Sequence, residues 1–384
     1  AISPSGASTG AFEAFELRDN NQIFFLGKSV NSAVGNINTK INSKLRGQNP
    51  NEQNKIDQIL LELDGSENKK ILGANAILAV SLATSKVSAL LQSQKLYEKL
   101  GKKFSLPNPL MNIINGGAHA DNDLNIQEFM IRPELSNNFM NAIEKCFLVI
   151  QNLKKILKSK KMLTNVGDEG GFAPSINSNE EALNLIVDAI EKSGLTPGKD
   201  ISICLDVAAN ELLNNEGKYS IKSKDYLSVN EVVEYYKKLI NLYPIKSIED
   251  PFAEEDWDAW KKITSEIGSS VQIVGDDLFV TNEKRLSKGI KEKSANSILI
   301  KPNQIGTLSE TLKVINLAKD NDINTIISHR SGDTEDTFIA DLAVATKSSQ
   351  IKTGSLARSE RVAKYNRLLR VEEELGNQAK MARI

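Results

Sequence analysis

The chain has 384 residues, of which 40% are hydrophobic and 25% are charged, and its formal net charge is −1. This length allows one large domain plus a smaller one, with a sizeable buried core. The nearly neutral charge, without a dense Lys/Arg stripe carrying aromatic residues, argues against a nucleic-acid-binding surface.

The cysteine content and the length of the apolar segments indicate the cellular compartment of the protein and whether it spans a membrane. Cys146 and Cys204 lie in apolar segments without a CxxC partner, so we expect two small buried hydrophobes in a reducing compartment. No segment reaches the roughly 20 apolar residues of a membrane span, and the best candidate, residues 71–85, contains Gly, Asn, Ser and Thr. The N-terminus has no basic-then-apolar signal, and we expect a cytoplasmic protein without a membrane span.

Residues 1–101 are predicted to form a small mixed α+β domain. Apolar and polar residues alternate over residues 13–18, which indicates a weak strand with Phe15 and Leu17 facing inward. Apolar residues then recur at helical spacing, and the small residues of the last segment favour close packing. The predicted helices span residues 28–45, 51–63 and 73–91.

From about residue 102 to residue 384, short apolar runs alternate with amphipathic helices, as in βα-barrels and doubly wound sheets. A polar stretch at residues 210–226 is predicted to form a surface hairpin or loop. The predicted strands span residues 201–205, 245–248, 271–274, 297–300 and 325–328. The predicted helices span residues 229–242, 257–267, 282–291, 308–320 and 337–346.

Each apolar run ends in a residue that can carry chemistry. The series Asp206, Glu249, Asp276, Lys301, His329 and Lys352 advances in steps of 43, 27, 25, 28 and 23 residues. Every step but the first fits one strand plus one helix of a (β/α) barrel, and the first includes the polar stretch. Because the carboxyl ends of barrel strands meet at one mouth, we expect these side chains to converge there.

The three strand-end carboxylates Asp206, Glu249 and Asp276 would repel one another if they were left unpaired. A hard divalent cation would relieve this repulsion, and ligands that are all oxygen favour Mg²⁺. A single such Asp is more often a helix cap or a turn residue, but three at successive strand ends reverse that preference. The adjacent Asp250 and Asp277 should point to the other side of their strands.

The cationic side chains complete the predicted mouth. Lys301 directly follows an apolar strand, where we expect its pKa to fall so that it can act as a base. The alternative is that Lys301 forms an ion pair with nearby carboxylates, and the two roles can coexist. Arg330, Ser331 and Lys352 suit a phosphate or a carboxylate. The two histidines, His119 and His329, are in polar segments, which makes a purely structural role in the core less favoured.

Two glycine-rich loops are candidates for segments whose backbone lies close to a bound ligand. Residues 165–171 (NVGDEGG) would bring Glu169 to the mouth, because glycine lets the backbone approach a ligand closely. Neither GxxxxGK[ST] nor GxGxxG is present, so this is not a nucleotide loop. Residues 5–10 (SGASTG) form a second loop, which on its own would be a flexible turn.

With these residues in place, the chain closely resembles the enolase family, in its bacterial form. The matching motifs run in order along essentially the whole chain, and SHRSG with TEDTFIADL is highly specific. They are residues 5–10 (SGASTG), 72–81 (LGANAILAVS), 127–131 (QEFMI), 165–171 (NVGDEGG), 247–254 (SIEDPFAE), 303–307 (NQIGT), 328–342 (SHRSGDTEDTFIADL), 351–354 (IKTG) and 357–361 (ARSER).

The resemblance implies an enzyme that interconverts 2-phosphoglycerate and phosphoenolpyruvate, a hydro-lyase of glycolysis that uses two Mg²⁺ ions. Implied metal ligands are Asp206, Glu249 and Asp276 for the first ion and Ser8 for the second. Lys301 is implied as the base and Glu169 as the acid, with Glu128 beside it and His329 near the substrate. The implied substrate-binding residues are His119, Gln127, Glu128, Lys301, Arg330, Ser331 and Lys352.

The resemblance also implies a fold and an assembly. The fold is a barrel with an irregular ββαα start, preceded by a small α+β domain, and the assembly is a homodimer or a higher homo-oligomer. Family members carry a few tens of residues before the SGASTG motif, so we expect this small domain to lack its first strands and the dimer to be weakened. Many bacterial members also have a cell-surface or secreted fraction.

Two other functions are compatible with parts of the sequence. The chain could be another enolase-superfamily enzyme acting on a different carboxylate, although the SGAST and SHRSG motifs together speak against this. It could also have a non-catalytic role, on the cell surface or in an RNA-processing assembly, although no signal, anchor or basic tail encodes one.

Overall fold

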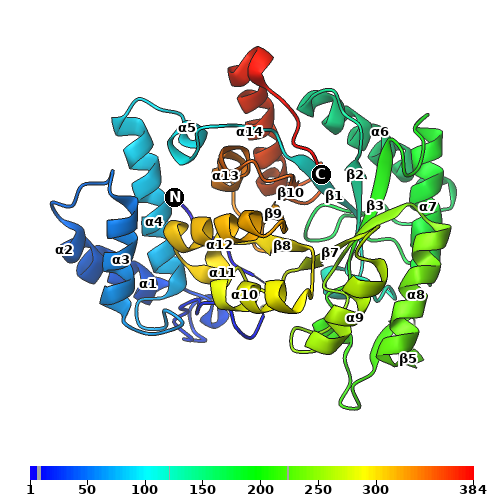
Figure 1. The fold of residues 1–384 in the computed structure, drawn as a ribbon, viewed down its shortest axis with the longest axis horizontal. Helices are drawn as coiled ribbons and strands as arrows, with labels where there is room; N and C mark the ends of the chain where they lie inside the picture. Colours follow the sequence, from blue (N-terminus) through cyan, green and yellow to red (C-terminus); the bar gives the residue numbers. More distant parts are fainter. Residues whose placement is uncertain (7–9, 121, 223–224) are drawn as a thin grey trace.

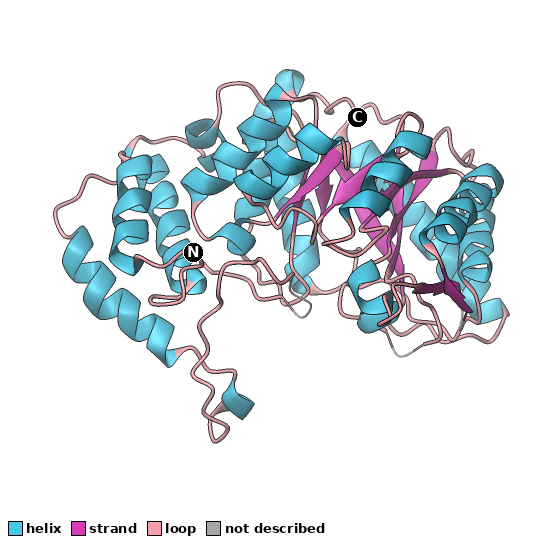
Figure 2. Ribbon diagram, turned by 60° about the horizontal axis from the view of Figure 1, so that its bottom comes forward, coloured by secondary structure: helices cyan, strands magenta, loops and turns pink. Residues whose placement is uncertain are grey.

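A computed structural model describes residues 1–6, 10–120, 122–222 and 225–384. A group of helices from the first hundred residues stands beside a closed barrel of strands, which further helices surround (Figures 1 and 2). The barrel confirms the fold class expected from the sequence.

The helices of the N-terminal part close on a small apolar core. Two of them, α3 and α4, pack against each other, and α4 also reaches the barrel, because its Leu78 and Leu82 belong to the main core while Ala76 and Ile77 belong to the small one. The helices are α1 (Asn31–Asn36), a π-helical segment (Ile37–Ile41), α2 (Asn42–Leu45), α3 (Gln53–Asp64), α4 (Ala74–Leu91) and α5 (Leu96–Leu100).

The predicted strand at residues 13–18 was wrong. This segment is extended but pairs with no strand, and Phe15 is 42% exposed rather than buried. Its backbone is held by the start of α4 instead: Ala74 N–H donates to Phe15 O at 2.8 Å, and Leu17 N–H donates to the Asn75 side chain at 3.1 Å. The alternation of residue types therefore marked a segment lying on a helix, and residues 1–6 and 10–101 contain no β-strand.

The barrel closes in the order β1-β10-β9-β8-β7-β6-β3-β2. Its first two strands are irregular, because β2 runs antiparallel to both β1 and β3 while all other neighbours are parallel. Two helices in succession, α6 and α7, then connect β2 to β3, which confirms the ββαα start. The strands are β1 (Asn108–Asn115), β2 (Glu128–Pro133), β3 (Ile201–Asp206), β6 (Ile245–Glu249), β7 (Gln272–Gly275), β8 (Ser297–Ile300), β9 (Asn324–Ser328) and β10 (Gln350–Lys352).

The five outer helices predicted from the sequence lie close to their predicted positions, and the structure adds four helices that were not predicted. Several begin with a side-chain cap, as where Asn138 accepts the Asn141 N–H and Thr307 accepts the Glu310 N–H. They are α6 (Phe139–Ser159), α7 (Asn179–Lys192), α8 (Val229–Leu242), α9 (Trp257–Ile267), α10 (Glu283–Glu292), α11 (Pro302–Ile305), α12 (Leu308–Asp320), α13 (Phe338–Thr346) and α14 (Ser359–Leu375).

The hairpin expected within residues 210–226 is present as β4 (Tyr219–Lys222) paired with β5 (Asp225–Leu227). Both cysteines are buried and free, as expected, and Cys204 lies inside the barrel with Leu110 and Met130. Among the described residues, α4 is long and apolar enough to cross a membrane by length and composition, which corrects the expectation that no segment is. Half of that window is buried inside the protein, so it is weak evidence for a span.

A buried polar network crosses the barrel at the end opposite to the mouth. The Arg132 guanidinium, 4% exposed, donates to Gln350 Oε1 at 3.0 Å and to Glu134 Oε1 at 2.7 Å. Gln350 Nε2 donates in turn to Gln272 Oε1 at 2.8 Å, and Gln272 Nε2 donates to Ser247 Oγ at 3.0 Å. The network links β2, β6, β7 and β10 through side-chain hydrogen bonds.

Replacing Arg132 with methionine is expected to lower the free energy of unfolding by about 2 kcal/mol, since it leaves the buried Gln350 Oε1 without its donor and removes the charge partner of Glu134. Urea unfolding followed by circular dichroism measures the loss. The matched control is Lys246→Met, because Lys246 is an exposed basic residue on barrel strand β6. Equal midpoints for the two variants would contradict a stabilising role for this network.

Candidate active site

The strand register brings three acidic residues side by side at one mouth of the barrel. Glu128 pairs with Asp206, and Asp206 pairs with Glu249. Because β2 runs antiparallel, its first residue, Glu128, lies at the same end as the last residues of β3 and β6. All three carboxylates are at most 4% exposed.

Lys352, the last residue of β10, holds these acids together. Its Nζ lies 2.8 Å from Asp206 Oδ2, 2.8 Å from Glu249 Oε1 and 3.2 Å from Glu128 Oε1. Burial alone would lower the pKa of Lys352, but the surrounding carboxylates raise it well above its usual value. The pKa values of Glu128 and Glu249 are also raised, by burial first and by neighbouring acids second.

Asp276 follows β7 and pairs with Lys301 Nζ, while its second oxygen accepts the Gln304 side-chain N–H at 3.0 Å. The prediction that the pKa of Lys301 falls is wrong, because this pKa is raised. Burial acts to lower it, but the Asp276 carboxylate outweighs burial and raises the pKa. Pro302 after Lys301 is the first residue of α11, where a missing N–H costs no helical hydrogen bond.

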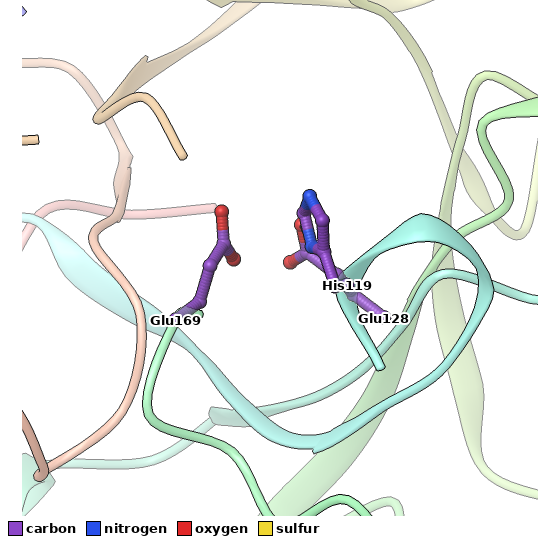
Figure 3. Close-up of side chains that lie close together, drawn as sticks. All are labelled: His119, Glu128 and Glu169. Carbon is purple, nitrogen blue, oxygen red and sulfur yellow. The ribbon is translucent and has the colours of Figure 1, made fainter. Parts of the chain in front are cut away.

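Glu169 faces Glu128 and His119 across the mouth (Figure 3). His119 Nδ1 lies 3.6 Å from Glu128 Oε1, and Asn112 Nδ2 donates to Glu169 Oε2 at 3.3 Å. Burial raises the pKa of Glu169, but His329 and the positive charge of Lys352 outweigh it and hold the pKa well below its usual value. Two facing carboxyls whose pKa values are driven apart are typical of acid–base sites.

His329 lies directly after β9 and is 3% exposed. Its Nε2 is 3.2 Å from Glu169 Oε1, and its Nδ1 is 2.7 Å from Arg361 Nη1. Burial first, and the Arg361 charge in addition, lower the pKa of His329 to about 3, so the ring is neutral at physiological pH. The ring thus lies between an acid and a permanent cation.

Arg330 is 3% exposed and meets Glu13 in a two-pronged ion pair, with Nη1–Oε2 at 2.8 Å and Nη2–Oε1 at 3.1 Å. Nη1 also donates to Asn303 Oδ1 at 3.2 Å. Gly6 lies so close that a Cβ there would be 1.9 Å from Arg330 Nη2. The N-terminal segment is therefore docked on the arginine that the sequence assigned to anion binding.

A small cavity of about 30 Å³ opens between these side chains. All but two of the site residues predicted from the sequence line this cavity. Glu249 does not line it but pairs with Lys352, which does. Ser8 lies outside the described residues. Its lining is His119, Gln127, Glu128, Glu169, Asp206, Asp276, Lys301, Ser328, His329, Arg330, Ser331 and Lys352.

In the part of the chain that the structure describes, acidic side chains come close enough to hold a metal ion in two places, and neither is the predicted set Asp206, Glu249 and Asp276. Among the described residues, the groups of side chains with ligand atoms within 4.8 Å of one another are His119–Glu128–Glu169 and Asp250–Asp276–Asp277. Asp250 accepts the backbone N–H groups of Asp276 and Asp277, each at 2.9 Å. The Asp250 side chain thus binds the backbone that follows β7 rather than lining the cavity, as expected.

Some residues of the site carried no signal strong enough to be found from the sequence. Glu13, Gln304 and Asn112 contact predicted site residues but do not end a strand or belong to a glycine-rich loop. Arg361 belongs to a family-like motif, yet nothing in that motif indicates that it would reach His329. Their positions depend on distant parts of the chain.

The barrel and its mouth define an acid–base enzyme with carboxylates that can hold a metal ion. Comparison with known proteins then identifies the family. Family models described as "Enolase, N-terminal domain" and "Enolase, C-terminal TIM barrel domain" match residues 1–100 and 103–384. An enolase of Pelagibacter ubique (strain HTCC1062) is 62% identical over 386 residues, covering 100% of this chain and 92% of that protein.

The chain belongs to the enolase family. It is accordingly an enzyme of the hydro-lyase class, a phosphopyruvate hydratase, which depends on a metal ion and acts on a small phosphorylated molecule.

Proposed function

We propose that this chain catalyses the reversible dehydration of 2-phospho-D-glycerate to phosphoenolpyruvate, with Lys301 as the base and Glu169 as the acid. The observation that carries this proposal is the single cavity that holds an amine, a carboxyl pair and a buried arginine. The C2 proton is a very weak acid, because it lies beside a carboxylate and its removal adds a further charge. A base on one side and an acid for the leaving hydroxide on the other answer both demands.

The acid–base roles follow from the surroundings of each group. Lys301 has a carboxylate partner, Asp276, and engaging that carboxylate in metal coordination would remove the interaction that raises the pKa of Lys301. Burial would then lower this pKa, as a base requires. Glu128 and Glu169 have opposite pKa shifts, which supports a pair that holds one proton between them for the departing hydroxide. His119 and His329 line the pocket beside this pair.

Asp206, Glu249 and Asp276 would hold a first Mg²⁺ ion. The fit is supported by their chemistry: all donors are oxygens, and Asp206 and Glu249 already share one cation, the Lys352 ammonium. We propose a second Mg²⁺ ion with Ser8 as a ligand. When bound, Mg²⁺ supplies positive charge that stabilises the doubly charged enolate.

The remaining cationic groups are proposed to bind the two anionic ends of the substrate. Arg330 and Ser331 would bind the phosphate, where Arg330 now pairs with the carboxylate of Glu13. Lys352 would contact the substrate carboxylate, and Gln127 offers at the pocket wall a buried side-chain oxygen that has no hydrogen-bond partner among the described residues. Arg330 and Lys352 are both already paired with carboxylates, so each of them lies where an anionic group can be bound.

We further propose two domains, residues 1–101 and 102–384, assembled as a homodimer or higher homo-oligomer in the cytoplasm. A surface or secreted fraction is part of the same proposal, as is the absence of direct nucleic-acid binding. The change from packed helices to barrel strands at β1 supports the division.

The test of the proposed reaction is a Mg²⁺-dependent assay that follows phosphoenolpyruvate formation by ultraviolet absorbance. We expect turnover of 2-phosphoglycerate that is abolished by EDTA and restored by added Mg²⁺. A panel of non-phosphorylated hydroxy acids serves as the comparison. Turnover of one of these acids, with none of 2-phosphoglycerate, would instead support a related enzyme of the superfamily.

A further inference from the structure

Arg361 contacts both catalytic loops without lining the cavity. It is the third residue of α14 and is 1% exposed. Nη1 lies 2.7 Å from His329 Nδ1 and donates to Arg330 O at 2.6 Å. Nη2 donates to Ser331 O at 2.6 Å and to Asp168 O at 3.2 Å. One buried guanidinium therefore joins the segment after β9 to the loop that carries Glu169.

The contact with His329 has a direct consequence for the ring. A guanidinium has only donors and stays charged at every pH at which proteins fold. The Arg361 N–H must therefore find a lone pair on Nδ1, and the single ring proton must be on Nε2, the nitrogen 3.2 Å from Glu169 Oε1. A proton on Nδ1 would place two donors against each other in a buried site.

We infer that Arg361 is a positioning residue: it fixes His329 as the neutral tautomer with its proton on Nε2, the nitrogen nearer to Glu169, and holds the Glu169 loop against residues 329–331. This inference deepens and rests on the proposed function, in which Glu169 is the acid. In the other tautomer, a lone pair would face the Glu169 carboxylate and the two groups would repel each other.

The start of α14 and the segment before it pack closely against the loop that carries Glu169. Ser355 N–H donates to Glu169 O at 2.8 Å, and Arg358 Nε donates to Gly167 O at 2.9 Å. Gly354 has φ +74°, and a Cβ there would lie 2.6 Å from Glu169 O and 2.9 Å from Arg361 Cδ. A glycine is needed where Arg361 and the loop pack so closely.

Lys352 acts on the protonation of the His329 ring in the same direction as Arg361, whereas Glu169 opposes both and is outweighed. His329 is faced by Glu169, Arg361 and Lys352, and burial with the two cations disfavours a second ring proton. Glu169 is faced by His329, His119 and Lys352, with Glu128 opposite. The ring should therefore keep one tautomer between about pH 5.5 and 8.5, well above the pH at which it could become charged.

Nitrogen-15 NMR of the histidine rings tests the inference directly, since the chain has 2 histidines. Histidine is labelled selectively in the full chain, and His119→Asn identifies the remaining signals as those of His329. We expect an unprotonated Nδ1 and a protonated Nε2 across this pH range. A protonated Nδ1, or an imidazolium, in the unaltered protein would overturn the inference without any Arg361 variant.

Variants of Arg361 then test whether this residue sets the tautomer of His329. Arg361→Met should leave a mixture of tautomers and lower kcat for 2-phosphoglycerate by about 10- to 100-fold, because the acid is misplaced, with a much smaller change in KM. Arg361→Lys keeps one cation but not the fork, and it should restore the tautomer in part. The matched control is Arg367→Met on the same helix, whose guanidinium pairs with Asp341 and Glu374 and should leave the tautomer unchanged.

The outcomes separate the two proposals. The expected tautomer in a protein that does not turn over 2-phosphoglycerate would remove the proposed reaction and leave the positioning of His329 standing. A fixed Nε2 proton in folded Arg361→Met, or in Arg361→Lys if the methionine variant does not fold, would overturn the inference even if the enzyme is active.

Discussion

Replacing Lys301 with methionine is expected to lower kcat for 2-phosphoglycerate by about 10³-fold, because a positioned general base contributes roughly 10²- to 10⁴-fold. Methionine keeps the length of the side chain but has no amine for the C2 proton. KM should change far less, since the proposed phosphate and carboxylate contacts belong to other side chains. Steady-state kinetics at saturating Mg²⁺ measure both parameters.

A second measurement separates lost proton transfer from general damage. In deuterated solvent, the unaltered enzyme should exchange the C2 proton of 2-phosphoglycerate, and Lys301→Met should not. The control is Lys313→Met, because Lys313 is a surface lysine with a side chain 65% exposed, paired with Glu283. If Lys301→Met kept its rate within about tenfold of normal, a residue contributing as a general base would have to be sought elsewhere.

Replacing Lys352 with methionine is expected to lower the free energy of unfolding in EDTA by about 3 kcal/mol or more, since removing one partner of a buried ion pair leaves its charges uncompensated. Lys352 is fully buried and neutralises Glu128, Asp206 and Glu249 together. Lys301→Met, which leaves a single carboxylate, should cost less. Urea unfolding with and without Mg²⁺ measures these differences.

The loss in Lys352→Met should depend on pH. The folded-state pKa values of Glu128 and Glu249 are raised, so the folded state binds more protons than the unfolded chain. Stability contributed by such groups is present at low pH and falls as pH rises above about 4.3, the ordinary pKa of Glu. The loss should therefore be smaller at pH 5 than at pH 8, and Mg²⁺ should reduce it at pH 8. A loss that is the same at both pH values and insensitive to Mg²⁺ would mean that charge compensation is not the role of Lys352.

Much of the barrel and its mouth could be predicted from the sequence, because both depend on local patterns. The helices α8, α9 and α12 have the predicted boundaries, and the predicted strand 297–300 is β8 itself. Strand ends converge in any parallel barrel, so the spacing of Asp206, Glu249 and Asp276 was enough to place them in one mouth.

Other features could not be predicted, because they depend on contacts between distant residues. Residues 13–18 alternate as a strand would, but they lie along the start of α4, where the Asn75 side chain bonds both backbone groups of Leu17. The pKa of Lys301 was expected to fall on the basis of burial and nearby cations. The direct pairing with Asp276 reverses this direction.

The sequence by itself determined the class of fold and the chemical inventory of the mouth: strand-end acids, a lysine, and a histidine–arginine–serine segment. Only the tertiary structure decided which of these groups touch. It placed Glu13, 317 residues away in sequence, on Arg330, and it placed Arg361 on His329. Periodicity reports which face of an element is buried, whereas a pKa or a tautomer is set by the few atoms within about 4–6 Å, which the folded chain brings from different elements.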